Sequence, residues 1–294
     1  MSREHGLAPH KPLLLLALLD EIQRGAYPSG LIVPTPELVA VFRAYWQSLG
    51  PFPGWQPRMD NPFRYLYRDG FWNFLVGGVP VTPEDRPYTL HQISRDFDGV
   101  RLAPDLWLLL QDRAAVSALR KQLLDVCFHR KEADVQKVPV AKVLDYEVEK
   151  LKAEAQSKFR VRKVREGSDD GYFVRHALFP RVIKNLYKDQ CCVCRIAPHV
   201  TGKSGIVDAA HILPFAEFHY DDPRNGLALC KNHHYGFDQG WFGITETYKV
   251  VVSPQLRNAP AYIEPGTEIL LPEDTLYHPD YTALKWQYDN KFLK

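Results

Sequence analysis

The sequence predicts an α+β protein of two domains, and three observations lead to this class. Residues 13–19 form a leucine-rich run after Pro12, which is typical of a buried helix that begins at a proline. Residues 206–213 are mostly β-branched or apolar and end at Pro214, as expected of a strand. A polar, charged stretch separates the two parts, so we expect two compact units.

Length and composition agree with a globular protein. The 294 residues can form two sizeable cores, and a hydrophobic content of 45% is ordinary for a folded chain. The longest apolar run, residues 13–19, is shorter than the roughly 20 residues that a membrane helix needs, and no cleavage site follows it. Four of the five cysteines lie in or beside a metal-like motif, which favours a reducing compartment over disulfides. We therefore expect a cytoplasmic protein with no membrane partner.

The amino-terminal domain, residues 1–145, is predicted to be helical with some β-structure. A second helix is expected over residues 35–48. Within residues 61–75, alternating side chains and the Asp69–Gly70 pair predict a short hairpin. The aromatic residues of this segment are interpreted mainly as core.

A charged helical linker is predicted at residues 146–171, and the second domain at 172–294. Apolar residues at 148, 151 and 155 share one helical face, and a glycine-bearing polar break follows at 166–171. Residues 158–165 carry five cations and no acid, so this run is either a solvated linker or a stripe that neutralises DNA phosphates. The sequence leaves both interpretations open. A helix is also expected over residues 173–187, around Pro180.

Two metal-ligand pairs lie in the second domain. Cys191 and Cys194 are separated by two residues, as are Cys230 and His233, and two such knuckles can close a tetrahedral zinc site. The alternative is that these are buried apolar thiols. The remaining cysteines, Cys127 and Cys192, are expected to be ordinary reduced thiols. A four-ligand site has no position open to substrate, so the zinc is expected to be structural.

His234 and Asp238 are candidates for a second ion. On a helix over residues 229–238, His233 and His234 project about 100° apart, so they cannot serve the same ion. Asp238 lies one turn beyond His234 on the same face, and an imidazole with a carboxylate suits a divalent cation. A simple surface pair is the alternative.

The order of these motifs resembles the HNH nuclease family, which has a ββα-metal fold. The resemblance implies that His211 is the general base, that Asn225 orients the active-site loop, and that His234 and Asp238 bind the catalytic ion. Many relatives place a metal ligand just before the base, where this chain has Ala210. Asp208 either supplies that ligand or caps the backbone. The implied reaction is attack of water on a DNA phosphate, aided by a divalent ion such as Mg²⁺ or Mn²⁺.

The amino-terminal domain resembles the sulfur-binding domain of McrA-type modification-dependent restriction enzymes. The resemblance rests on His10-Lys11-Pro12 before the leucine-rich helix and on residues 61–66 before residues 69–72. It implies binding of phosphorothioate-modified double-stranded DNA around Pro62. Asn61 stands where the family often has an aromatic residue. The implied DNA-binding residues are His10, Lys11, Asn61, Pro62, Arg64, Tyr65 and Arg86.

These inferences combine into one hypothesis, a modification-dependent DNA endonuclease with a reader domain followed by a zinc-stapled HNH domain. One alternative is an HNH restriction nuclease that reads a modified base. Another is a non-catalytic, zinc-bearing DNA-binding regulator, which Ala210 favours. A homodimer is a geometrically simple way to cut both strands with one active site each, but no interface can be identified from the sequence, which leaves the oligomeric state open.

Overall fold

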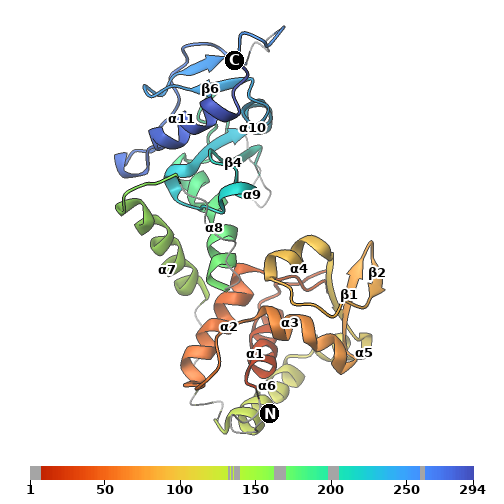
Figure 1. Cartoon of the computed structure of the whole chain (residues 1–294). Helices are drawn as coiled ribbons and strands as arrows, with labels where there is room; N and C mark the ends of the chain where they lie inside the picture. Colours follow the sequence, from red (N-terminus) through yellow and green to blue (C-terminus); the bar gives the residue numbers. More distant parts are fainter. Residues whose placement is uncertain are drawn as a thin grey trace. The chain divides into compact units, whose positions relative to one another are not determined.

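A computed structural model describes residues 8–131, 133, 135, 140–161, 170–197, 205–258 and 262–294. The chain divides into two compact units (Figure 1), and each is described by itself. The first comprises Met1–Tyr146 and Gly167–Val174, and the second comprises Glu147–Glu166 and Arg175–Lys294. Residues 162–165 of the basic run and residues 166–169 of the predicted break lie outside the described residues.

The first unit is built around helix α1, His10–Gln23, which contacts α2, Pro36–Leu49, and α6, Arg113–Phe128. Pro12 lies in the first turn of α1, and the leucines after it are largely buried, as predicted. The Thr35 side chain accepts a hydrogen bond of 3.1 Å from the backbone N–H of Leu38 and so caps α2. Both helices predicted for this unit are therefore confirmed.

The hairpin predicted within residues 61–75 is wrong. This segment forms helix α3, Asp60–Tyr65, and the 3-10 turn η1, Leu66–Asp69, before strand β1, Trp72–Val76. Gly70 has a φ of 83° and ends η1, so the turn signal stops a helix instead of joining two strands. Both partners of β1 come later in the chain, and the first follows directly after Gly77 and Gly78, so the tight turn lies at these glycines and not at Asp69–Gly70.

Strand β1 is the centre of an antiparallel sheet with the order β2-β1-β3, where β2 is Val79–Val81 and β3 is Gly99–Leu102 (Figure 1). The unit also contains α4, Leu90–Asp96, and α5, Pro104–Leu109. Asp20, Tyr45 and Arg120 form a buried polar cluster among the helices. The Tyr45 hydroxyl donates to Asp20 at 2.5 Å, and Arg120 donates to Asp20 at 3.3 Å. This cluster joins α1, α2 and α6.

The second unit contains a ββα arrangement. Strand β4, Val207–His211, pairs antiparallel with β5, Gly226–Cys230, and helix α10, Lys231–Asp238, follows β5 directly. The register places His211 opposite Gly226. A Cβ on Gly226 would lie 2.3 Å from Ile183 of helix α8, Asp170–Leu186, so only glycine lets this hairpin lie so close to the helix. The two paired strands followed by a helix agree with the predicted α+β class.

Further elements belong wholly or in part to the second unit (Figure 1). They are α7 Val140–Ala153, η3 Glu154–Gln156, α9 Phe215–Phe218, η4 Pro223–Asn225, β6 Phe242–Ile244, β7 Val250–Val252, η5 Thr275–Tyr277 and α11 Tyr281–Asn290. Strands β6 and β7 pair antiparallel, and α11 contacts β6. Within the described residues, none of the helices combines the length and the apolar character that crossing a bilayer requires.

Candidate functional site

The two predicted metal knuckles meet in the second unit. Cys191 and Cys194 lie in the turn after α8, Cys230 ends β5, and His233 lies in the first turn of α10. Their four ligand atoms lie within 4.8 Å of one another. The hairpin and the helix thus bring together residues that are far apart in the sequence.

The spacing of these atoms fits zinc. The Sγ atoms of Cys194 and Cys230 are 3.9 Å apart, and Sγ of Cys191 is 3.6 Å from Nδ1 of His233. With Zn–S bonds of about 2.3 Å, the edges of a tetrahedron are about 3.8 Å long. Three thiolates and one imidazole are also a typical structural donor set. These four residues could therefore hold one zinc ion.

A second hydrogen bond orients the histidine of this cluster. Nε2 of His233 donates to the carbonyl oxygen of Tyr262 at 2.8 Å, which leaves Nδ1 toward the sulfur atoms as the coordinating nitrogen. Cys192, inside the first knuckle, is buried, and burial raises the pKa of its thiol well above the usual value. It remains a neutral thiol, whereas Cys127 is an exposed thiol of α6.

His234 and Asp238 form the predicted pair one helical turn apart. Nε2 of His234 lies 3.5 Å from Asp238, whereas Nδ1 lies 3.7 Å from Asp208. Since the two ring nitrogens face different carboxylates, the three side chains do not converge on one point. Asp208 also lies 2.5 Å from the ammonium of Lys231. His234 and Asp238 could bind a divalent ion, and Asp208 as a ligand of that ion stays a prediction.

His211 shares a cavity with this pair. It is the last residue of β4 and lines a cavity of about 420 Å³ together with His234 and Asp238. Burial raises the pKa of Asp238 above its ordinary value, although the charges of His234 and Lys291 lower it in part. A bound cation would favour the ionised carboxylate. The structure thus brings the predicted base and the predicted ion ligands to one place.

Asn225 is fully buried and does not line this cavity. Its Oδ1 accepts a hydrogen bond of 2.8 Å from the N–H of Leu213, and its Nδ2 donates to the carbonyl oxygen of Tyr220 at 2.9 Å. Leu213 lies near the start of the loop between β4 and β5, and Tyr220 lies farther along it. Asn225 therefore fixes this loop, which fits the orienting role that the resemblance implies.

Sequence reasoning missed two polar neighbours of His211. Nε2 of His211 lies 2.9 Å from Oδ1 of Asp221, and Nδ1 of His176 lies 3.3 Å from the same oxygen. Burial alone would raise the pKa of Asp221, but its hydrogen bonds to the two imidazoles and their charges hold it below the usual value. Asp221 belongs to no spacing motif, and only its place between His211 and Asn225 in the sequence hinted at a role.

A cavity of about 460 Å³ in the first unit gathers most of the predicted DNA-reader residues. The predicted residues among its lining are His10, Lys11, Asn61, Pro62 and Tyr65. Trp55, Gln56 and Arg58 also line it, and these were not predicted. They follow α2 on a loop without a recognisable motif, so no local signal points to them.

His10 forms part of the wall of this cavity. Its Nε2 lies 2.8 Å from the carbonyl oxygen of Gln56, and its ring contacts Trp46 and Trp55 with centroids 4.9 and 5.4 Å apart. Burial lowers the pKa of His10, and the hydrogen bond to Gln56 offsets this in part. Beside it, the ammonium of Lys11 lies 2.7 Å from Asp69, and both side chains are well exposed.

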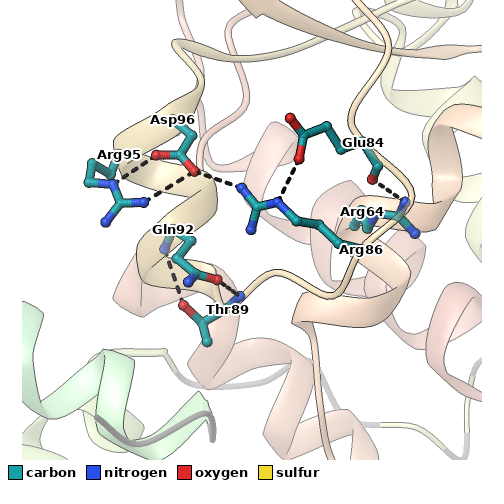
Figure 2. A network of polar contacts seen from close by, with 7 residues as sticks. All are labelled: Arg64, Glu84, Arg86, Thr89, Gln92, Arg95 and Asp96. Atoms are coloured by element: carbon teal, nitrogen blue, oxygen red, sulfur yellow. Dashed lines mark hydrogen bonds and ion pairs between the residues drawn. The ribbon is translucent and has the colours of Figure 1, made fainter.

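The two predicted arginines lie outside this cavity and make internal contacts. Arg64 is 1% exposed, donates to the backbone carbonyl of Glu84 and lies 3.0 Å from Asp85. Figure 2 shows Arg64 reaching the loop before α4, and Arg86 held between Glu84 at 2.8 Å and Asp96 at 3.5 Å. Arg64 would have to leave its buried position to contact DNA, whereas Arg86 is exposed. Their roles as DNA contacts stay predictions.

Part of the chain matches a known protein family. Residues 191–245 match the family described as HNH endonuclease. This segment contains both knuckles, His211, Asn225, His234 and Asp238. The second unit therefore contains an HNH endonuclease domain.

No curated protein matches the chain. A solved structure titled "Modification dependent TagI restriction endonuclease" is similar, with 27% sequence identity and a TM-score of 0.33. The similarity covers 40% of this chain and 38% of that chain, so it spans well under two thirds of the solved protein.

Proposed function

We propose that this chain is a metal-dependent DNA endonuclease that cuts phosphorothioate-modified double-stranded DNA. One observation carries the nuclease part of the proposal. His211, His234 and Asp238 line a single cavity, and all three lie within residues 191–245, which match the HNH endonuclease family.

The residues of the site have different roles in hydrolysis. The ring of His211 takes a proton from the attacking water, and Asn225 holds the loop that begins beyond this histidine. A divalent ion such as Mg²⁺ or Mn²⁺, bound by His234 and Asp238, would supply positive charge against the charge that builds on the phosphate. His233 faces the cysteines instead, so the zinc site serves folding.

The cavity of the first unit supports the reader part of the proposal. Five of the seven predicted DNA-binding residues line it, and its wall at Pro62 and Trp55 is apolar. Sulfur is larger, more polarisable and less hydrated than oxygen, so an apolar wall favours it over a phosphate oxygen. Lys11 at the rim carries positive charge for a neighbouring phosphate, after exchange from Asp69.

One observation favours a second candidate, recognition of a modified base. Trp55, His10 and Tyr65 are flat rings around the same cavity, and a base stacks well on such side chains. In either case a homodimer would provide one active site for each strand.

Cleavage of matched plasmids tests both parts of the proposal. Phosphorothioate-modified, base-modified and unmodified forms of one plasmid are incubated with the protein, with Mg²⁺, with Mn²⁺ or without a divalent ion. We expect metal-dependent cutting of the phosphorothioate form and no cutting by His211→Ala. Preferential cutting of a base-modified plasmid would support the second candidate, and binding without any cutting would identify a regulator.

A further inference from the structure

Asp221 lies between two imidazoles that come from different parts of the second unit. His211 ends β4, His176 lies on α8, and Asp221 lies in the loop that Asn225 fixes. Both rings approach the same carboxylate oxygen, at 2.9 and 3.3 Å. The Asp221 side chain is only 6% exposed, so its contacts depend on the fold and not on solvent.

The neighbouring aspartate offers an internal comparison. Asp222 is fully buried and accepts hydrogen bonds from the Tyr220 hydroxyl and from the backbone and guanidinium of Arg224. These partners make Asp222 a residue that fixes the loop. The Asp221 carboxylate, by contrast, forms hydrogen bonds with two titratable rings, one of which lines the cavity.

Aromatic side chains stack on both histidine rings and hold them in place. His211 stacks on Phe179 with centroids 4.0 Å apart, and His176 stacks on Phe215 at 3.8 Å. With the plane of His211 fixed and Nε2 bonded to Asp221, Nδ1 is the nitrogen that remains to accept a proton. The charged or titratable side chains facing His211 are Asp221 and His176 on one side, and His234, Asp238 and Lys291 around the cavity.

We infer that Asp221 is a positioning residue for His211: it accepts the Nε2–H hydrogen bond, selects the tautomer with a bare Nδ1, and stabilises the imidazolium that forms on proton uptake. This inference rests on the proposed nuclease function. When water attacks, its proton moves to Nδ1 and its oxygen bonds to phosphorus. The bond from phosphorus to the leaving sugar oxygen breaks, and this oxygen keeps the electron pair and takes a proton from solvent water. His176 donates to the same carboxylate and keeps it aimed at His211.

The same three side chains could instead hold a metal ion, because their ligand atoms lie within 4.8 Å of one another. In that arrangement Nε2 of His211 would coordinate the ion and could not donate to Asp221.

Steady-state cleavage by the full chain is the first test. Asp221→Asn should lower kcat about 10- to 100-fold and leave the KM for DNA nearly unchanged, because the residue acts through His211. The acidic limb of its pH–rate profile should move to lower pH, since a carboxylate favours the protonated ring and the amide does not. Asp222→Asn serves as the control for loop damage and should lower stability without moving that limb. Equal kcat values and superimposed pH profiles for Asp221→Asn and the unchanged protein would overturn the inference.

Nitrogen NMR of ¹⁵N-histidine-labelled full chain is the second test, and it needs no cleavage. His211, assigned from the signal lost in His211→Gln, should be the Nε2–H tautomer, and Asp221→Leu should mix the tautomers. A predominant Nδ1–H form in the unchanged protein would contradict the inference even if the protein cuts DNA. Binding of one further equivalent of Zn²⁺ that is lost in His176→Phe would also contradict it, and would assign a metal site. If the unchanged protein shows the expected tautomer and yet fails to cut DNA, that result would refute the proposed function and, with it, a catalytic role for Asp221 and His211.

Discussion

Phe179 and His211 lie face to face, with ring centroids 4.0 Å apart and ring planes 9° from parallel. Phe179 is fully buried in α8, so one face of the histidine rests on a rigid wall. His176, on the same helix, reaches the site through Asp221. Both residues precede the segment that matches the HNH family, residues 191–245, so this site depends on a helix outside that segment.

Replacing His211 by alanine should abolish cleavage. We expect the rate to fall by at least about 100-fold, because the proton acceptor is lost. Circular dichroism and DNA binding should be nearly unchanged, since the side chain lines a cavity. A folded His211→Ala protein that cuts DNA at the normal rate would remove this histidine from the mechanism.

Replacing Asn225 by alanine should destabilise the second unit and reduce cleavage. The change leaves the N–H of Leu213 and the carbonyl of Tyr220 without this partner, at a cost of about 1–3 kcal/mol for each buried group. Asn290→Ala, at an exposed asparagine of α11, is the control and should change the unfolding free energy by less than about 0.5 kcal/mol. Urea unfolding measures both, and equal values would show that Asn225 does not fix the loop.

Replacing Cys230 by serine should release zinc and unfold the second unit in part. Cys230 is a predicted zinc ligand and also the N-cap residue of α10, and binding at such sites is coupled to folding. Cys127→Ser removes an exposed thiol of the first unit and should retain one zinc per chain. Elemental analysis and thermal unfolding give the comparison, and absence of zinc from the gently purified unchanged protein would refute the assignment.

The reader cavity can be tested by DNA binding in a His211→Ala background, which prevents cleavage. Pro62→Gly or Tyr65→Ala should reduce the preference for a phosphorothioate duplex over its oxygen counterpart. Lys11→Gln should weaken binding to both duplexes and lower the salt dependence by about one unit, because one phosphate contact is lost. Equal affinity of the unchanged reader for both duplexes in several sequence contexts would exclude sulfur recognition.

The buried cluster of Asp20, Tyr45 and Arg120 predicts an asymmetric response to mutation. Arg120→Met should destabilise the first unit by about 3–5 kcal/mol, because it leaves the Asp20 carboxylate buried without its cation. The double variant Asp20→Leu with Arg120→Met should recover much of this loss, since no charge remains to be desolvated. Chemical denaturation of the unchanged protein, the two single variants and the double variant checks the prediction, and additive losses would contradict it.

The sequence predicted those parts of the structure that follow from local spacing. The zinc knuckles, the helix that carries His234 and Asp238, and the capped helix after Thr35 depend on residues three or four apart, whose geometry a helix or a turn fixes. The cavity at Pro62 was reached through the family resemblance, which grouped residues 10–11 with 61–65.

The parts that could not be predicted depend on contacts between distant residues. The DNA-binding role of Arg64 stays a prediction, but its burial against the loop at residues 84–85, 20 residues away, has no local signal in the sequence. Asp221 and His176 are 45 residues apart, and no periodicity joins them. The hairpin prediction failed for a different reason, because residues 60–69 are helical and the tight turn that follows β1 lies at Gly77 and Gly78.

The position of Cys230 has a practical consequence for anyone who assays this protein. It is the last residue of β5 and the N-cap of α10. His233 of the zinc site and His234 of the cavity both lie on α10, so the two sites share one helix. EDTA at a concentration that removes zinc would therefore inhibit cleavage in two ways: it would destabilise the second unit, and it would remove the catalytic divalent ion. Add-back separates the two effects: Mg²⁺ alone should restore activity after brief chelation, whereas prolonged chelation should require Zn²⁺ and refolding before Mg²⁺ has any effect.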